Sequence, residues 1–245
     1  MLLEISNLKK RFGGLWALWD IHLSVAPGEL RGIIGPNGSG KSTLFNLIVG
    51  RYRPTSGRIL FKGKNIARMR PDRRARLGIT IKFQITNVFN GLTVMDNMRL
   101  GLTGCPKSHA SRDRVSQRRL EQEAMALLER IGLAEKKSES AGALSHGEKQ
   151  WLEIGMALAT DPTLLLLDEP TSGMGPEETQ KTAELILGLK GSLTILVIEH
   201  DMDFVKSVSE KITVLNRGNF LTEGTYEEVK SDERVIEAYL GKGWD

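Results

Sequence analysis

The amino-acid sequence predicts an α/β fold in which a core of parallel strands is interrupted by a mostly helical segment. Two short apolar runs, Leu164–Leu167 and Leu193–Ile198, are nearly continuous, as expected of strands that are buried on both faces of a parallel sheet. Between about residues 88 and 159 the pattern changes to helical periodicity. The chain has 245 residues, of which 40% are hydrophobic, and is therefore long enough to bury a large core.

The first sixty or so residues alternate apolar runs with turn signals. Three strands are expected there, at Leu2–Leu8, Ala17–Val25 and Leu30–Ile34. Pro27-Gly28 predicts the turn between the second and third of them. A glycine-rich loop follows, and residues 42–49 then have the apolar spacing of a helix. Arg58–Phe61, placed before Lys62-Gly63-Lys64, is typical of one arm of a β-hairpin.

The remaining elements divide the chain into three parts. An amphipathic helix is expected over residues 111–131, and Ser145 is a candidate N-cap of a second helix. The pattern then predicts a strand, a helix, a strand and a terminal amphipathic stretch, at Thr163–Leu167, Pro176–Leu189, Leu193–Ile198 and Tyr226–Leu240. We therefore expect an α/β core over residues 1–86 and 159–245, with a helical subdomain inserted at 87–158.

Composition excludes several classes of protein. The single cysteine, Cys105, excludes an intramolecular disulfide framework and a cysteine-cluster metal site, and it favours a reducing compartment. No apolar run approaches the roughly 20 residues that a membrane span needs. The first residues carry charge too early for a secretory signal. No internal repeat is visible, which argues against solenoids and propellers.

Charge is divided unevenly along the chain. Residues 1–120 hold 22 Lys and Arg against 6 Asp and Glu, whereas residues 121–245 hold 12 against 24, and the formal net charge is +4. Such polarity indicates an anionic ligand, a nucleic acid or a membrane surface near the first half. Composition alone leaves these three alternatives open.

A phosphate-binding loop is the strongest motif. It has the pattern G-x-x-x-x-G-K-S and comprises Gly35, Pro36, Asn37, Gly38, Ser39, Gly40, Lys41, Ser42 and Thr43. The motif follows an apolar strand and opens a helix, so that backbone N–H groups and the helix N-terminus face phosphate oxygens. Lys41 is predicted to reach the β- and γ-phosphates, and the Ser42 hydroxyl to ligate Mg²⁺.

A second motif places two carboxylates at the end of an apolar strand. Asp168 and Glu169 follow the run Leu164–Leu167 and precede Pro170. The carboxyl ends of strands are where open α/β sheets bind ligands. Asp168 is therefore expected to hold Mg²⁺, and Glu169 to polarise an attacking water.

A third motif, Leu144-Ser145-His146-Gly147-Glu148, is by itself only a helix cap. Beside the first two motifs it predicts a second phosphate-binding helix N-terminus, with exposed amides at Ser145 and Gly147. One chain cannot easily bring this helix and the 35–43 loop to the same phosphate. The combination therefore indicates a dimer.

Three further positions complete the candidate site. Gln84 follows the apolar strand at 79–83 and is a candidate sensor of Mg²⁺ and the γ-phosphate. His200 follows a predicted strand and is placed to hydrogen-bond a γ-phosphate. Phe12 is a candidate platform for stacking a base, with Trp16 as its competitor, and either ring could instead belong to the core.

Taken in this order, the motifs resemble those of the nucleotide-binding subunit of an ATP-binding cassette (ABC) transporter, over essentially the whole chain. The resemblance implies a P-loop NTPase (RecA-like) core with an N-terminal antiparallel β subdomain and an inserted α-helical subdomain. By position, Gly35–Thr43 matches the Walker A loop, Leu164–Asp168 the Walker B strand and Leu144–Glu148 the family signature. Gln84, Glu169, His200 and Phe12 match the Q-loop glutamine, the catalytic glutamate, the switch histidine and the adenine-stacking aromatic.

The resemblance also implies how such a subunit works. ATP and Mg²⁺ are the expected cofactors, and ATP-driven closure of a dimer the expected mechanism. The dimer is expected to be a homodimer in isolation or a heterodimer with a related ATPase subunit. The other implied partners are transmembrane permease subunits and, indirectly, a periplasmic solute-binding protein, with no nucleic acid. The implied location is the cytoplasmic face of the inner membrane, as a peripheral subunit.

Finer similarities favour a subfamily. Val197–Val205 and the tail Arg234–Gly241 are similar to the ATPase subunits of branched-chain amino acid importers, whereas Leu144–Met156, Gly28–Arg31 and Lys82-Phe83-Gln84 are similar to the urea-importer subunit. We therefore expect an importer of branched-chain amino acids, urea or a related small polar solute. The alternatives are an exporter ATPase of the lipopolysaccharide-extraction type, a non-transport ABC ATPase acting on DNA or ribosomes, and a plain P-loop kinase, against which the 144–148 motif argues.

Three positions, in two motifs, depart from the family pattern. The signature usually has Gly and Gln where this chain has His146 and Glu148, and Glu148 could place a negative charge near the ATP of the partner. The family has an aspartate where this chain has Gly175. That aspartate helps to couple the two ATP sites of the dimer, so slow hydrolysis at both sites is one expectation.

One basic run remains outside every motif. It comprises Arg68, Arg70, Arg73, Arg74 and Arg76. The simplest interpretation is a solvated face. An alternative hypothesis places the run near the anionic cytoplasmic surface of the membrane.

Overall fold

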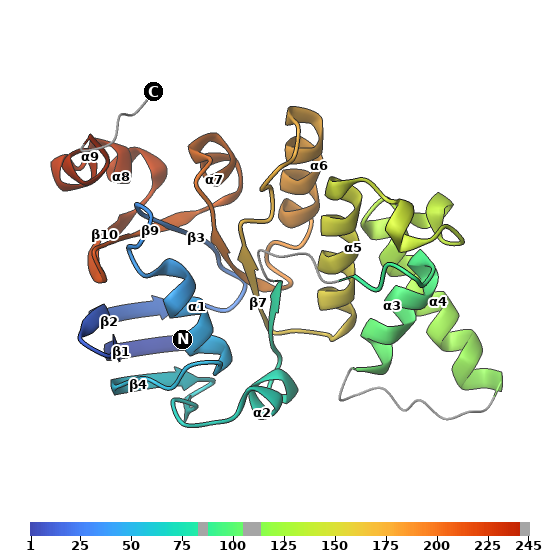
Figure 1. Cartoon of the computed structure of the whole chain (residues 1–245), viewed down its shortest axis with the longest axis horizontal. Helices are drawn as coiled ribbons and strands as arrows, with labels where there is room; N and C mark the ends of the chain where they lie inside the picture. Colours follow the sequence, from blue (N-terminus) through green and yellow to red (C-terminus); the bar gives the residue numbers. More distant parts are fainter. Residues whose placement is uncertain (83–87, 105–113, 241–245) are drawn as a thin grey trace.

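The computed structural model describes residues 1–82, 88–104 and 114–240, which form two β-sheets and a group of helices beside them (Figure 1). One sheet has six strands in the order β10-β9-β3-β8-β7-β6, and the other has four in the order β2-β1-β4-β5. The six-stranded sheet comprises β3 (Leu30–Ile34), β6 (Ile79–Lys82), β7 (Leu164–Asp168), β8 (Thr194–Ile198), β9 (Lys211–Asn216) and β10 (Asn219–Gly224). The four-stranded sheet comprises β1 (Leu3–Phe12), β2 (Leu15–Val25), β4 (Ser56–Phe61) and β5 (Lys64–Asn65).

The centre of the six-stranded sheet is parallel and buried on both faces, as the apolar runs predict. Every residue of β3, β7 and β8 is buried. Along β7, Leu164 and Leu166 pack in one core with helix α1 (Lys41–Val49). Leu165 and Leu167 pack on the other face with α6 (Pro176–Leu187). Burying one such leucine contributes about 1.5–3 kcal/mol, so this strand is held firmly from both sides.

The antiparallel sheet packs on the face of α1 that is turned away from α6. Its strands supply Leu3, Ile5 and Leu8 to the same core as Phe45 and Ile48 of α1. Strand β1 pairs with both β2 and β4, and β4 pairs with the short β5. The expected hairpin arm at Arg58–Phe61 is thus confirmed, and it is also joined to the first strand of the chain.

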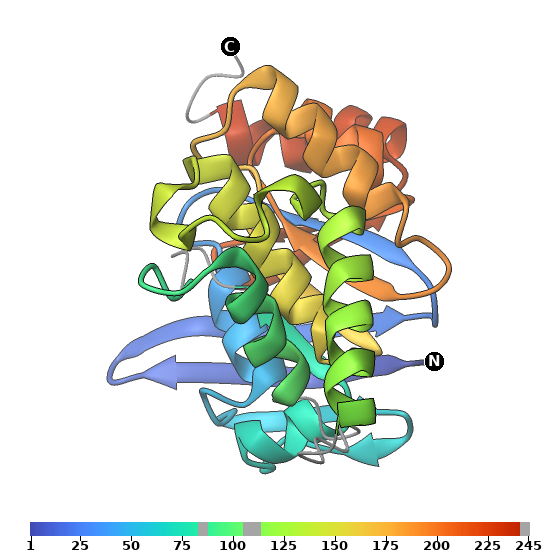
Figure 2. The same cartoon turned by 90° about the vertical axis from the view of Figure 1, so that its right-hand side faces the viewer.

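The helical group lies beside the end of the sheet that β6 and β7 form (Figures 1 and 2). It contains α3 (Val94–Thr103), α4 (Arg114–Arg130), α5 (His146–Ala159) and the short 3-10 helices η1 (Ala134–Lys136) and η2 (Ala141–Ala143). These elements share a core of their own around Met98, Leu128 and Leu152. Helix α4 agrees with the expected helix over 111–131, of which residues 111–113 lie outside the described residues. Within the described part of the chain, no helix is long and apolar enough to cross a membrane.

The C-terminal part contains elements that the sequence patterns do not reveal. Strands β9 and β10 form an antiparallel hairpin at one edge of the large sheet, and α7 (Met202–Val208) lies between β8 and β9. The amphipathic stretch at 226–240 forms two helices, α8 (Tyr226–Ser231) and α9 (Glu233–Leu240). The break falls at Asp232, whose carboxylate accepts hydrogen bonds from the Arg234 guanidinium at 3.0 and 2.6 Å.

The arginine run corrects one expectation. Residues 71–76 form the short helix α2 (Pro71–Arg76), and Arg74 within it is 1% exposed. Its guanidinium donates hydrogen bonds to backbone carbonyls at the end of α1 and before α2, those of Leu47, Ile48, Ala67 and Met69, at 2.6–3.1 Å. A solvated face is therefore wrong for Arg74, because these carbonyls need a buried donor. Arg68, Arg70, Arg73 and Arg76 are exposed, as expected.

Candidate functional site

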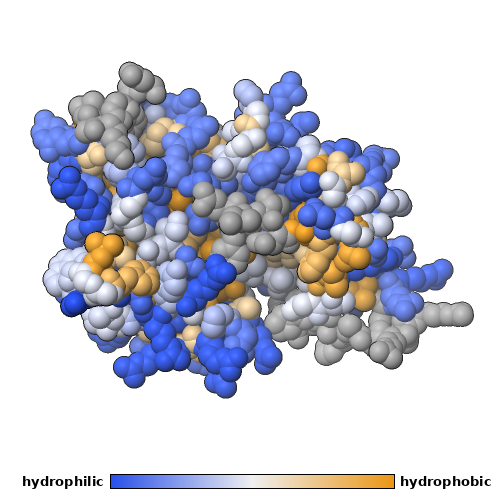
Figure 3. Space-filling view, in the orientation of Figure 1, coloured by the Kyte–Doolittle hydropathy of each residue, from blue (hydrophilic) through white to orange (hydrophobic). Residues whose placement is uncertain are grey.

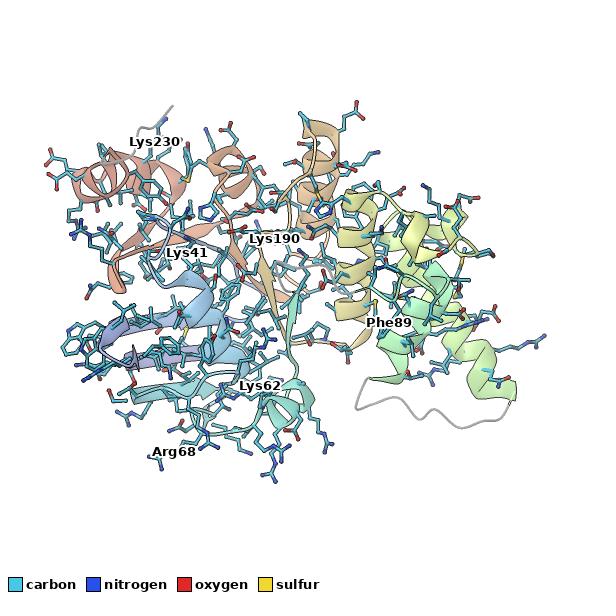
Figure 4. All side chains as sticks on the ribbon, in the orientation of Figure 1. Lys41, Lys62, Arg68, Phe89, Lys190 and Lys230 are labelled. Carbon is cyan, nitrogen blue, oxygen red and sulfur yellow. The ribbon has the colours of Figure 1, made fainter. Side chains whose placement is uncertain are left out.

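The glycine-rich loop lies between β3 and α1 and encloses the Lys41 side chain (Figure 4). Gly40, directly before α1, has φ +102°, and a Cβ there would lie 2.7 Å from the Ala17 carbonyl oxygen. Glycine is required at this turn for both reasons. The Lys41 ammonium donates hydrogen bonds to the carbonyl oxygens of Gly35 and Pro36, at 2.7 and 3.2 Å. Burial lowers its pKa, while Glu169 and Asp168 oppose that shift.

Asp168 ends β7 beside this loop. Its side chain is 6% exposed, and its Oδ1 is buried without a hydrogen-bond partner. Burial and the neighbouring Glu169 raise the pKa of Asp168 to about 6, against the opposing effects of Lys82, Lys41 and a hydrogen bond with Ser42. An unpartnered carboxylate oxygen next to a serine hydroxyl is a donor set that suits Mg²⁺, which prefers oxygen ligands. Asp168 and Ser42 therefore fit the metal role expected of them.

Glu169 and His200 meet across the ends of two neighbouring strands. Glu169 has φ +48°, in the left-handed region, and its N–H donates to the Ile198 carbonyl at 2.9 Å. His200 Nε2 and Glu169 Oε1 are 2.8 Å apart, with the side chains 42% and 19% exposed. A non-glycine residue in this backbone region costs about 1–3 kcal/mol, and such strain is concentrated at functional sites. The two residues proposed for hydrolysis thus form one hydrogen-bonded pair.

Glu199 is a buried residue of this site that the sequence interpretation misses. Its side chain accepts hydrogen bonds from the Thr171 N–H at 2.9 Å, from the Thr171 hydroxyl at 2.6 Å and from the His200 N–H at 3.1 Å. Glu199 therefore ties the backbone of His200 to the segment that follows Glu169. From the sequence it is only an acid after an apolar strand, and its partner Thr171 lies 28 residues away. The one available signal is that a carboxylate directly precedes the candidate histidine.

The signature motif begins helix α5 with a complete capping box. The Ser145 hydroxyl accepts from the Glu148 N–H at 3.2 Å, and Glu148 Oε2 accepts from the Ser145 N–H at 3.0 Å. Glu148 also pairs with Lys136 at 2.7 Å. Burial acts to raise the pKa of Glu148, but the hydrogen bonds with Lys136 and Ser145 hold this pKa below its ordinary value. Glu148, which stands where the family usually has Gln, thus directs its negative charge to Lys136 and Ser145 of its own chain.

The same region contradicts the expected exposure of the Ser145 and Gly147 amides. The Ser145 N–H is occupied by Glu148, and Gly147 is buried. A Cβ at Gly147 would overlap the carboxylate of Glu178 on α6, which also accepts a hydrogen bond from the Gly175 N–H at 3.2 Å. The reason is that α6 packs its first turn against the start of α5. A phosphate that approaches this helix N-terminus must displace Glu178.

The other departures from the family pattern lie in the same contact. His146 Nε2 lies 3.0 Å from the Ser172 carbonyl oxygen, and Gln150 Nε2 lies 3.2 Å from the His146 ring nitrogen. Gly175 is the N-cap residue of α6. His146 therefore joins the start of α5 to the loop after Glu169.

The phosphate loop and the signature helix are separate within one chain. In Figure 1, α1 and α5 lie on opposite sides of β7. The structure therefore brings together Lys41, Ser42, Asp168, Glu169 and His200 but leaves Ser145 and Gly147 apart from them. This is the separation that the expected dimer requires. Gln84 lies outside the described residues.

The two candidate stacking residues lie on opposite faces of the β1–β2 hairpin. The Phe12 ring packs edge-on against Tyr52, 5.1 Å between centroids, and Lys10 lies over it. Trp16 packs against Trp19 on the other face, with centroids 4.6 Å apart. Phe12 is 40% and Trp16 37% exposed, so neither ring belongs to the core, and Phe12 stays the predicted stacking residue.

Comparisons with known proteins identify the family that the chain resembles. The family model described as ABC transporter matches residues 18–172, and a model described as branched-chain amino acid ATP-binding cassette transporter matches residues 221–245. The high-affinity branched-chain amino acid transport ATP-binding protein LivG of Escherichia coli is 39% identical, covering 98% of both chains. BraF of Pseudomonas aeruginosa, which carries the same description, is 38% identical, with the same coverage.

Solved structures give the same result for the fold. The ADP conformation of an ATP-binding cassette of an ABC transporter has a TM-score of 0.87 and 33% identity, covering 98% of this chain and 99% of that one. A dimeric post-hydrolysis cassette bound to ADP and Pi has a TM-score of 0.79 and 26% identity, covering 91% and 98%. The expected fold, a P-loop NTPase core, is confirmed. The chain therefore belongs to the ABC transporter family and is one of its ATP-binding, ATP-hydrolysing subunits.

Proposed function

We propose that this chain is the ATPase subunit of an importer of branched-chain amino acids. The observation that carries the hydrolytic part is the pair of Glu169 and His200 beside the phosphate loop, 2.8 Å apart. The substrate class rests on the relatives from Escherichia coli and Pseudomonas aeruginosa, whose names include branched-chain amino acid transport. These names favour branched-chain amino acids over urea and over the exporter alternative.

The chemistry follows from the positions of the side chains. Lys41 exchanges its two loop carbonyls for phosphate oxygens when ATP enters, and so neutralises charge that develops in the transition state. Glu169 orients the attacking water for in-line attack, and His200 holds Glu169 and hydrogen-bonds the γ-phosphate. Ser42, Asp168 and Gln84 are the residues proposed to hold Mg²⁺, which when bound polarises the phosphoryl oxygens. Phe12 stacks on the adenine.

The second half of each ATP site comes from another subunit. Ser145 and Gly147 at the start of α5 bind the ATP of the partner, so that ATP joins two chains face to face. Dimeric cassettes among the solved structures support this arrangement. The partner in the importer is a second copy or a related ATPase subunit.

A groove beside α2 is the proposed seat for a cytoplasmic helix of the permease. It encloses about 830 Å³ and lies between the end of α1, helix α2 and strand β6, with Gly104 and Thr160 on its far side. Its walls include Val49, Pro71, Ala75 and Ile79, so an amphipathic helix could bury its apolar face there. This docking would hold the subunit at the cytoplasmic face of the inner membrane, with a periplasmic binding protein delivering solute from the other side.

Two measurements test the proposal. Glu169→Gln should bind ATP, lose hydrolysis by at least about a hundredfold and accumulate as an ATP-bound dimer in size-exclusion chromatography. Hydrolysis at the parental rate would show that Glu169 does not have this role. Uptake of labelled leucine and labelled urea by a deletion strain decides the solute, since loss of urea uptake alone would contradict the proposed substrate.

A further inference from the structure

We propose that exposed cations around α2 form a surface that binds anionic lipid headgroups beside the permease groove. We call this surface the α2 face and define it as Lys64, Arg68, Arg70, Arg73 and Arg76, all exposed. Residues 51–82 contain eleven Lys and Arg and a single acid, Asp72. Figure 3 shows hydrophilic side chains along the lower edge of the molecule, the edge at which Figure 4 labels Arg68.

Arg74, which is not part of the α2 face, holds this face in place. Arg74 anchors α2 through hydrogen bonds to the carbonyls of Leu47, Ile48, Ala67 and Met69. A Cβ at Gly50 would lie 2.7 Å from Arg74 Nε, so α2 sits directly on the end of α1. With Arg74 turned inward, the helix presents Arg70, Arg73 and Arg76 to solvent as a fixed group.

The charge of the α2 face is not neutralised within the described residues. Arg70 pairs with Asp72 at 3.1 Å. Among the described side chains, Lys64, Arg68, Arg73 and Arg76 have no carboxylate partner. By contrast, Lys190 and Lys206, elsewhere on the surface, pair with Glu210 and Glu227. The α2 face is therefore a field of one sign that an anionic surface complements.

The α2 face itself contains no aromatic ring, which favours a lipid surface over a nucleic acid. Single-stranded nucleic acid is bound by basic grooves in which aromatic side chains stack on bases. Within residues 51–82, all of them described, the one exposed large hydrophobic side chain is Tyr52, which lies outside the α2 face and packs its ring against Phe12. Headgroups need only positive charge, and each Lys or Arg near an anionic bilayer raises binding by about fivefold.

The position of the α2 face agrees with membrane contact. Arg51, Asp72 and Arg76 line the proposed permease groove, so the groove and the α2 face adjoin on the same side of the subunit. A permease helix in the groove would turn this side toward the bilayer. This orientation rests on the proposed function, but lipid binding by the isolated subunit does not.

The test uses the full chain, without nucleotide or permease, and sedimentation with vesicles. One set of vesicles is phosphatidylcholine alone, and the other is an equal mixture of phosphatidylcholine and phosphatidylglycerol. The variant K64Q/R68Q/R70Q/R73Q removes four cations that do not line the groove. The control K181Q/K190Q/K206Q/K230Q removes four exposed lysines from α6, α7, α8 and the loop after α6, and so changes net charge equally. Circular dichroism and the ATPase rates of both variants check that they fold.

The parental chain and the control should sediment with the mixed vesicles at low salt and be released at about 1 M salt, where the Debye length is about 3 Å. The α2-face variant should bind at least about a hundredfold more weakly. Equal loss in both variants, or equal binding to phosphatidylcholine alone, would overturn the proposal. Binding to poly(U), a single-stranded nucleic acid, is measured alongside. An α2-face variant that keeps vesicle binding but loses poly(U) binding would also overturn the proposal. Loss of vesicle binding with intact leucine uptake would leave the proposed importer function standing, so the two ideas fail separately.

Discussion

Asp168 shows how a single residue combines burial with a task that needs charge. Burial raises the pKa of its carboxyl to about 6, from an ordinary 3.8. Between about pH 4 and pH 6 the native state therefore holds a proton that the unfolded state has lost, and stability falls as pH rises through this window. Above about pH 6 the site carries an unfavourable charge that costs roughly 3 kcal/mol. We infer that this cost is the price of a free carboxylate oxygen at the end of β7.

The first prediction follows from that cost. Asp168→Asn should raise the free energy of unfolding of the nucleotide-free protein at pH 8 by about 1–3 kcal/mol and leave it nearly unchanged below about pH 4. The same variant should lose Mg²⁺-dependent ATP hydrolysis. Urea unfolding of both proteins at several pH values measures the difference. A variant that is less stable than the parent at pH 8 would show that the charge at Asp168 is not disfavoured in the fold.

Glu199 is expected to act on the reaction by positioning His200, from whose N–H it accepts a hydrogen bond. Glu199→Gln keeps an acceptor for Thr171 but places an amide where the His200 N–H now donates. We expect kcat to fall roughly tenfold, the equivalent of one charge-assisted hydrogen bond, with little change in the KM for ATP because the Lys41 loop is untouched.

Thr171→Ser is the matched control, since it retains both the N–H and the hydroxyl that Glu199 accepts from. Steady-state ATPase kinetics of the two variants, with thermal unfolding alongside, separate positioning from stability. A change in KM with kcat preserved would argue that Glu199 supports nucleotide binding instead.

At the scale of elements, the sequence best predicts the strands in which every residue is buried. Strands β7 and β8 are fully buried, so their apolar runs identify them directly. Strand β10 is half exposed and alternates weakly, and α7 has only seven residues, so neither produces a clear period. The carboxylate of Glu178 covers Gly147 because α6 packs on α5, a contact between helices that no local pattern encodes.

The same limit applies to the arginines at positions 68–76. In the sequence, Arg74 is one of five similar residues, and only the fold shows that its guanidinium meets four carbonyls at the junction of α1 and α2. The site itself was more predictable than these contacts. A glycine-rich loop before Lys41, and acids or a histidine after apolar strands, imply positions at the carboxyl edge of a sheet. The parallel register of β7 and β8 then brings Glu169 next to His200.

Arg74 gives the prediction at this scale. Arg74→Met should remove the donors of the α1–α2 junction and lower the free energy of unfolding by about 2–4 kcal/mol, because buried carbonyls lose their partners. Arg73→Met, one residue earlier and exposed, should change it by about 0.5 kcal/mol or less. Urea unfolding of the pair at pH 7 makes the comparison, and equal effects of the two substitutions would contradict the anchoring role of Arg74.

For the whole molecule, the separation of α1 from α5 determines what one chain can do alone. In the proposed dimer, Lys41 and Glu169 would supply one side of an ATP site, and Ser145 and Gly147 the other side of a different site. Glu178 stands against Gly147 in the single chain, so closing this dimer would require the carboxylate to give way to a phosphate of higher charge. We therefore expect the strength of ATP-driven association to depend on residues of both chains.

This division predicts complementation between two inactive chains. Lys41→Ala should fail to bind ATP in its own loop, and Ser145→Arg should block the ATP of its partner, so neither protein should hydrolyse ATP alone. In a heterodimer of the two, one site carries both defects and the other carries neither. An equal mixture should therefore regain up to about a quarter of the parental rate per chain, because half of the dimers are mixed and each has one intact site.

The ATPase rate of the mixture, titrated with one variant against a fixed amount of the other, measures this recovery. A mixture as inactive as its components would mean that both sites must be intact together or that the two motifs do not share one ATP. Chemical cross-linking of the mixture with ATP distinguishes these two outcomes, since a trapped heterodimer without turnover would favour obligatory coupling between the sites.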